Sequence, residues 1–147
     1  MLQQEKTTGL QAVVSAARLC QSVQNALVSE GTTGSGTQIK DDKSPVTIAD
    51  FGAQALVSHV LQVDFPDFLM VGEENADELR ADDVLRQRMM TEISHVEPML
   101  QESTALELID RGAYDGGPVG RHWALDPIDG TKGFLRGDQY AIALALI

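Results

Sequence analysis

Two acidic residues, Asp126 and Asp129, stand three positions apart at the end of an apolar run, in the sequence WALDPIDGT from Trp123 to Thr131. The apolar residues before Asp126 predict a strand. Pro127 fixes φ and removes a backbone donor, so we expect the chain to turn there and bring the two carboxylates together. The pair either caps a turn, since Asp-Pro and Asp-Gly are common turn dipeptides, or shares a cation.

Further carboxylates occur where other elements begin or end. Glu73 and Glu74 follow a short apolar run, 68–72, that predicts a strand, and Asp50 falls in the first turn of a helix predicted over about 47–62. Carboxylates buried together repel one another unless a cation joins them, and a site made only of oxygen ligands favours Mg²⁺, Mn²⁺ or Ca²⁺ over zinc. This pattern predicts a site for more than one metal ion.

Such a site would allow an acidic protein to act on a phosphate, because metal ions bridge carboxylates to phosphoryl oxygens. Gly130 permits an unusual φ or a close backbone approach. The backbone N–H groups of Gly130, Thr131 and Lys132 could then face the same phosphate.

The remaining elements must position these residues. Apolar residues at spacings of three and four predict a first amphipathic helix from Leu10 to about Ser29; they are Leu10, Val13, Val14, Ala17, Cys20 and Leu27. The second helix would bury Ile48, Phe51, Ala55, Leu56 and Val60. The Gly-rich segment 31–37 predicts a connector rather than a nucleotide-binding loop, because no strand precedes it and no Lys-Ser/Thr closes it.

The second half alternates charged and apolar stretches. The charged stretch from Asp77 to about Leu108 predicts one or two surface helices interrupted near Pro98, and a last strand is expected over 140–147. The near-continuous apolar residues of that strand predict cover on both faces. Either another subunit or a further part of a larger protein would supply this cover, and we favour the latter, with residues 1–147 forming an N-terminal part.

Composition narrows the class of protein. The 147 residues suit one domain, and a formal net charge of -11 argues against binding to nucleic acid or to an anionic membrane surface. No signal pattern occurs at the N-terminus, and the longest apolar run, 141–147, is far below the ~20 residues that span a bilayer. The single cysteine, Cys20, is expected in the core. A cytoplasmic location is expected.

Three segments carry a family resemblance. The segment Asp126 to Thr131 resembles the signature of the Mg²⁺-dependent, lithium-sensitive phosphatases related to inositol monophosphatase, and 44–50 and 71–74 match the two earlier motifs of that family in order. Within the family, Lys132-Gly133-Phe134 is similar to the 3'(2'),5'-bisphosphate nucleotidases, whereas inositol monophosphatases tend to have Thr-Asn-Phe there.

The resemblance implies roles for individual residues. Glu73, Asp126, Asp129 and the backbone carbonyl of Ile128 would bind Mg²⁺. Asp50 and Thr131 would orient and deprotonate the attacking water, and Gly130 and Thr131 would contact phosphate. Glu74 and Lys132 would lie just outside this set.

The resemblance also implies a layered α/β sandwich of the sugar-phosphatase type, of which this chain would supply the N-terminal α+β part. The implied substrates are adenosine 3',5'-bisphosphate and its sulfated relative, 3'-phosphoadenylyl sulfate, which places the enzyme in sulfur metabolism. A further metal-binding Asp and most nucleoside contacts would lie in the absent part. Activity of this chain alone is therefore expected to be weak or absent.

Two alternatives remain open. One is a non-catalytic interaction module that pairs with itself or a partner through its exposed apolar last strand. The other is an inositol (poly)phosphate 1-phosphatase activity within the same superfamily, which Lys132-Gly133-Phe134 disfavours.

Overall fold

Six helices and three strands make up the part of the chain that the computed structural model describes, residues 2–31 and 44–147. In chain order they are α1 (Gln3–Gly31), α2 (Ser44–Asp64), β1 (Met70–Val71), α3 (Asp77–Ala81), α4 (Asp83–Val96), α5 (Glu102–Asp110), β2 (Trp123–Asp129), α6 (Thr131–Arg136) and β3 (Ala141–Leu146). Apart from Gly31, which ends α1, the expected connector 31–37 lies outside the described residues.

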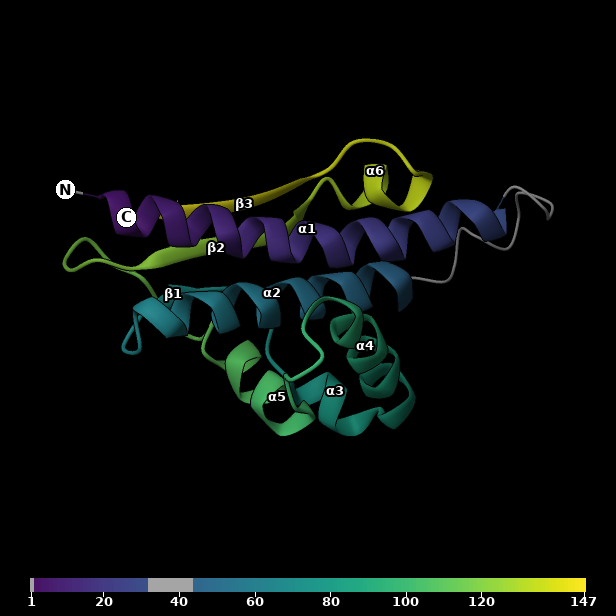
Figure 1. The fold of residues 1–147 in the computed structure, drawn as a ribbon, viewed down its shortest axis with the longest axis horizontal. Coiled ribbons are helices and arrows are strands. Elements are labelled where there is room, and N and C mark those ends of the chain that lie inside the picture. The colour runs from purple at the N-terminus through teal and green to yellow at the C-terminus, as the bar shows by residue number, and fades with distance from the viewer. Residues whose placement is uncertain (1, 32–43) are drawn as a thin grey trace.

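The elements form layers, with α1 and α2 side by side between the sheet and the group α3–α5 (Figure 1). The two long helices run antiparallel, and a hydrogen bond from Thr8 near the start of α1 to Asp64 at the end of α2 joins them. Helix α1 contacts β3, α2 contacts β2, and α4 and α5 pack on α2. The expected mixed α/β class is confirmed.

The buried face of α1 differs from the predicted one. Cys20 is buried as expected, but Leu10 and Val14 are 56% and 49% exposed, and the helix instead buries Ala12, Ala16 and Leu19. Small residues let α1 approach α2 closely: a Cβ added to Gly52 of α2 would lie 2.7 Å from a methyl group of Leu19. Close backbone packing, rather than the largest apolar side chains, therefore decides which face is covered.

Helix α2 is the centre of the molecule. It begins at Ser44, about a turn earlier than predicted, so Asp50 lies in its second turn and not its first. All the residues from Phe51 to Ser58 are buried, because helices or strands surround α2, whereas one buried side was predicted. The predicted Val60 is only partly buried.

The sheet has the order β1-β2-β3, with β1 parallel and β3 antiparallel to β2. Strand β1 is two residues long rather than the predicted five, and Val71 also forms an isolated bridge with Ala113. Strand β2 continues through Pro127 to Asp129, so the turn expected at Pro127 is absent. Proline is tolerated here because it sits at an irregularity in the ladder, where no backbone donor is needed.

Strand β3 lies at the edge of this sheet and is covered on one face only. Its even-numbered residues are partly buried, whereas Ala141, Ala143 and Ala145 are exposed. Among the described residues, helices pack on a single side of the sheet. The cover expected over the other face, from another subunit or a further part of a larger protein, stays a prediction.

The charged stretch forms three helices, α3 to α5, and not one or two. Asp82 separates the first two, and its carboxylate accepts a hydrogen bond from the backbone N–H of Leu85 at 2.9 Å as an N-cap of α4. The break between α4 and α5 falls around Pro98, as predicted.

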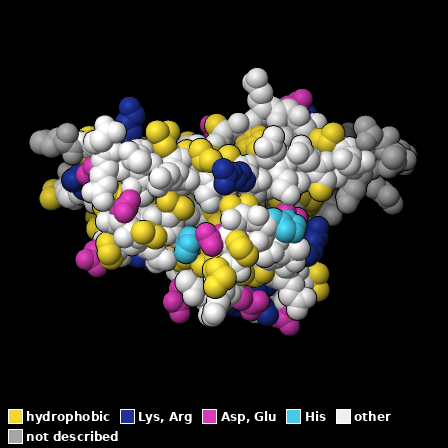
Figure 2. All heavy atoms as spheres, viewed as in Figure 1, with side chains coloured by type: hydrophobic (Ala, Val, Ile, Leu, Met, Phe, Trp, Pro, Cys, Tyr) yellow, Lys and Arg dark blue, Asp and Glu magenta, His cyan; other side chains and the backbone are white. Residues whose placement is uncertain are grey.

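Acidic side chains are spread over the visible face and gather in no single patch on it (Figure 2). Of the helices that the structure describes, none combines the length and hydrophobicity that a membrane span requires.

Candidate metal and phosphate site

Asp126 and Asp129 lie on one face of the sheet because β2 contains a bulge. Asp126 pairs with Ala143 of β3, but Asp129 pairs with Ala141, so two residues of β2 stand opposite one residue of β3. Residues three apart in a regular strand point to opposite faces, and the extra residue reverses the second of them. Both aspartates therefore share the face on which Ala141 and Ala143 are exposed.

Glu73 reaches the same region from β1. Glu73 stands two residues after Val71, which pairs with Ala124, and Asp126 stands two residues after Ala124. Both line an open hollow of about 580 Å³ over the uncovered face of the sheet. The Oδ1 atom of Asp126 is buried and has no hydrogen-bond partner among the described residues. A buried carboxylate oxygen without a partner is costly unless a ligand or cation satisfies it.

Asp50 approaches these carboxylates from α2. Burial, followed by the negative charges of Glu74, Glu73 and Asp126, raises the pKa of Asp50 to about 7. A carboxyl group with a pKa near neutrality can exchange a proton under physiological conditions. Perturbed values of this kind are concentrated at functional sites.

The pKa values of Glu73 and Glu74 are also raised. Burial and the charges of Asp126 and Asp129 raise the pKa of Glu73, and burial with the charges of Glu73 and Glu78 raises that of Glu74. The structure thus brings Asp50, Glu73, Glu74, Asp126 and Asp129 into one electrostatic field. Carboxylates in such a field repel unless cations compensate them.

The donor set suits a hard divalent cation in kind, since it is made of carboxylate oxygens and one oxygen lacks a partner. Among the described residues, however, no three His, Cys, Asp or Glu side chains converge closely enough to hold one ion together. The carboxylates share a region but do not form a closed coordination shell.

The other predicted residues follow Asp126 along the chain. Ile128 lies in the bulged part of β2 with its side chain buried. Gly130 has φ +96°, a left-handed conformation that glycine adopts without strain, and it turns the strand directly into α6. Thr131 and Lys132 are exposed in the first turn of α6, immediately after Asp129.

One buried polar residue beside these carboxylates was not predicted from the sequence. Gln54 is fully buried on α2, one helical turn after Asp50, and hydrogen bonds to the backbone of Glu74. A polar amide within an apolar helical segment, four residues from a candidate catalytic acid, is the sequence signal that could have identified it.

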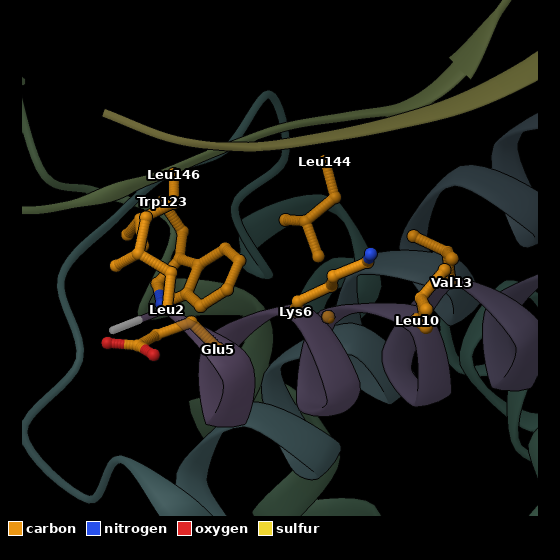
Figure 3. Close-up of a pocket in the computed structure, with 9 residues that line it drawn as sticks. Leu2, Glu5, Lys6, Leu10, Val13, Trp123, Leu144 and Leu146 are labelled. Carbon is orange, nitrogen blue, oxygen red and sulfur yellow. The ribbon is translucent and has the colours of Figure 1, made fainter.

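A separate apolar hollow lies between the start of α1 and the sheet (Figure 3). Trp123, Leu144 and Leu146 point from the strands toward α1, which carries Leu10 and begins just after Leu2. None of the predicted catalytic or metal-binding residues lines it.

Comparison with known proteins identifies the family. A family model described as the inositol monophosphatase family matches residues 3–147. The chain is similar to proteins named 3'(2'),5'-bisphosphate nucleotidase from Oryza sativa, with 49% identity over 97% of this chain and 42% of the relative, and from Schizosaccharomyces pombe, with 46% identity over 97% and 43%. It is also similar to 3'(2'),5'-bisphosphate nucleotidase 1 of Arabidopsis thaliana, with 49% identity over 90% and 39%.

The chain therefore spans less than half the length of these relatives. The family match covers nearly all of the chain and includes Asp50, Glu73, Asp126 and Asp129. This chain belongs to the inositol monophosphatase family.

Proposed function

We propose that this protein hydrolyses the 3'-phosphate of adenosine 3',5'-bisphosphate to give AMP and phosphate, and acts likewise on 3'-phosphoadenylyl sulfate, with Mg²⁺ as cofactor. The observation that carries the proposal is the 49% identity with a protein named as a bisphosphate nucleotidase, over a chain whose acidic residues share one electrostatic field. The segment Lys132 to Phe134, which resembles the nucleotidases, favours this substrate over inositol phosphates.

In this proposal the acidic residues hold the cation and prepare the water. Glu73, Asp126, Asp129 and the carbonyl of Ile128 would bind Mg²⁺, which supplies positive charge to offset phosphoryl oxygens and activates water. Asp50, with a pKa raised to about 7 in the absence of metal, would accept a proton from the attacking water together with Thr131. Gly130 and Thr131 would contact the phosphate, while Glu74 and Lys132 support the site from outside.

The test is a chimera in which residues 1–147 replace the matched part of the Schizosaccharomyces pombe relative, which supplies the remaining length. We expect Mg²⁺-dependent phosphate release from adenosine 3',5'-bisphosphate, inhibited by Li⁺, and much slower release from inositol 1-phosphate. Asp126→Asn and Thr131→Ala should each reduce turnover by at least about 100-fold without loss of the fold. A folded chimera that releases no phosphate from the nucleotide would reject the proposal.

The 147-residue chain by itself is expected to be weakly active or inactive, because a catalytic unit that lacks members loses most of its rate. The same assay on the isolated chain checks this. We propose a cytoplasmic location.

A second candidate is a non-catalytic form that self-associates through β3. The exposure of Ala141, Ala143 and Ala145 on this edge strand favours it, because such an edge is a template for pairing with another chain. Light scattering after size-exclusion chromatography decides the matter: a monomer at all concentrations would reject association.

A further inference from the structure

The amide of Gln54 bonds to backbone atoms of two segments, the loop that carries Glu74 and the last turn of α5. Its Oε1 accepts a hydrogen bond from the N–H of Glu74 at 3.1 Å, and its Nε2 donates to the carbonyl of Glu74 at 2.7 Å and to that of Ile109 at 2.7 Å. The side chain is 0% exposed. A buried amide whose two N–H donors and carbonyl oxygen are all bonded holds its partners firmly, because releasing one leaves an unsatisfied polar group.

Two glycines make room for this amide. A Cβ added at Gly72 would lie 2.7 Å from Oε1 of Gln54, and one added at Gly112 would lie 2.5 Å from Nε2. The same two glycines are joined by a hydrogen bond from the N–H of Gly72 to the carbonyl of Gly112 at 2.8 Å. The backbone is therefore shaped around Gln54 from both sides.

Gln54 binds the backbone N–H and carbonyl of Glu74, and the orientation of this backbone sets the directions in which the side chains of Glu73 and Glu74 point. The N–H of Glu74 belongs to the peptide that joins it to Glu73, and its carbonyl to the following peptide, so both neighbouring peptide planes are fixed. On the other side of this segment, Asp110 accepts a hydrogen bond from the N–H of Ala76 at 2.8 Å. The segment carrying Glu73 and Glu74 is thus held at both ends.

Gln54 also sets this segment against Asp50. Residues four apart on a helix lie on the same face, so α2 presents Asp50 and Gln54 side by side. Without a cation, the charges of Glu73 and Glu74 repel Asp50, which acts to drive the acidic segment away from α2. The hydrogen bonds of Gln54 oppose this displacement.

We propose that Gln54 is a positioning residue that holds the Glu73–Glu74 segment against α2 and thereby sets the affinity of the acidic cluster for a divalent cation. The inference rests on the proposed metal site and is independent of which phosphate ester is hydrolysed. A site held in place before the ion arrives binds more tightly, because ordering costs nothing further on binding.

The test measures Mn²⁺ binding to the 147-residue chain by electron paramagnetic resonance, with no substrate present. Gln54→Met keeps the length of the side chain and removes all three hydrogen bonds. We expect a dissociation constant about 10- to 100-fold higher than that of the unmodified chain, the range found when a residue supporting metal ligands is lost. Gly112→Ala, which pushes on the amide from the loop after α5, should weaken binding in the same direction.

Two control variants separate positioning from stability. Ile93→Ala opens a cavity in α4, where the residue is 0% exposed, and should lower the melting temperature comparably while leaving Mn²⁺ affinity unchanged. Ser58→Ala removes a buried hydroxyl without a hydrogen-bond partner, one turn beyond Gln54, and should change neither quantity.

The outcomes are distinct from those of the nucleotidase assay. Loss of Mn²⁺ affinity in Gln54→Met and Gly112→Ala, with unchanged affinity in Ile93→Ala and Ser58→Ala, supports the role of Gln54 even if the chimera hydrolyses no nucleotide. Equal affinity in Gln54→Met and the unmodified chain, equal weakening in Ile93→Ala, or no Mn²⁺ binding by the unmodified chain would each overturn it, whatever the chimera does.

Discussion

Asp50 on α2 lies close enough to Glu74, which follows β1, for the negative charge of Glu74 to be the largest cause after burial of the raised pKa of Asp50, about 7. The two residues are 24 positions apart in the sequence, and Gln54 joins the elements that carry them. The metal-free acidic cluster is therefore held together against its own repulsion. Both its stability and its response to cations should depend on pH.

Stability without divalent cations is expected to fall as the pH rises from about 4 to about 7. Folded Asp50 keeps its proton up to a pH of about 7, whereas in the unfolded chain it loses it near ~4. The folded state binds more protons between these values, so the free energy of unfolding decreases as the pH rises through them. Asp50→Asn should make the slope shallower and raise the melting temperature at pH 8, measured by circular dichroism. An unchanged pH profile would show that Asp50 is not the residue responsible.

Adding Mg²⁺ should offset the difference in stability between the unmodified chain and Asp50→Asn at pH 8. A cation favours the ionised carboxylates, so adding Mg²⁺ at pH 8 should raise the melting temperature of the unmodified chain more than that of Asp50→Asn. Equal shifts in the two chains would place Asp50 outside the cation's influence.

The sequence allowed the acidic cluster to be predicted more fully than its geometry. Glu73 and Asp126 were assigned to strand ends, and parallel β1 and β2 bring such ends to one edge of the sheet. The side-chain directions of Asp126 and Asp129 depend on a bulge that involves β3, and spacing within one strand cannot show how a second strand pairs with it. The properties of Pro127, a fixed φ and no backbone donor, predict a turn where the strand in fact continues, because the bulge accommodates the proline.

The sequence predicted least well which side chains pack between the helices. Leu10 and Val14 fit a helical apolar stripe, yet α1 packs through Ala12 and Ala16, because the close approach to α2 favours small residues. Likewise, the role of Gln54 depends on backbone atoms more than 15 residues away, which no local pattern contains.

Gly133→Ala should disturb the packing of α6 against the segment that joins it to β3. A Cβ at this position would lie 2.1 Å from the backbone carbonyl oxygen of Gln139, and the carbonyl of Gly133 accepts a hydrogen bond from the N–H of Asp138 at 2.8 Å. Backbone cannot move aside as a flexible side chain does, so we expect a loss of ~1–3 kcal/mol in the free energy of unfolding by urea titration. Lys132→Ala, at the exposed neighbouring position, is the control and should change stability little. Equal stability of the two variants would contradict the tight packing at Gly133.

Arg111 should contribute to stability through the loop that precedes β1. Its Nη2 donates to the carbonyls of Pro66 at 2.8 Å and Phe68 at 3.1 Å, and its guanidinium lies 3.9 Å from the ring centroid of Phe68. Arg111→Met keeps the aliphatic stem but removes these interactions, so thermal unfolding should show a loss of ~2 kcal/mol. Arg88→Met, an exposed arginine on α4, is the matched control with an expected change within ~0.5 kcal/mol. A similar loss in both variants would show that general charge, and not this contact, is responsible.

The thiol of Cys20 should report the unfolding of the helical core. Burial, with a smaller effect of the Asp50 charge, raises its pKa to about 12, and the residue is 0% exposed between α1 and α2. Since the thiolate is the reactive form, reaction with a disulfide reagent at pH 8 should be at least ~1000-fold slower in the folded chain than in denaturant. The sequence contains one cysteine, so the signal comes from this site alone. Asp50→Asn, which removes the neighbouring charge but leaves the burial, should change the protection only slightly, because burial is the larger cause. Rapid reaction of the native chain would mean that α1 and α2 separate readily, and the cluster beside them would then lack the rigid support on which metal binding depends.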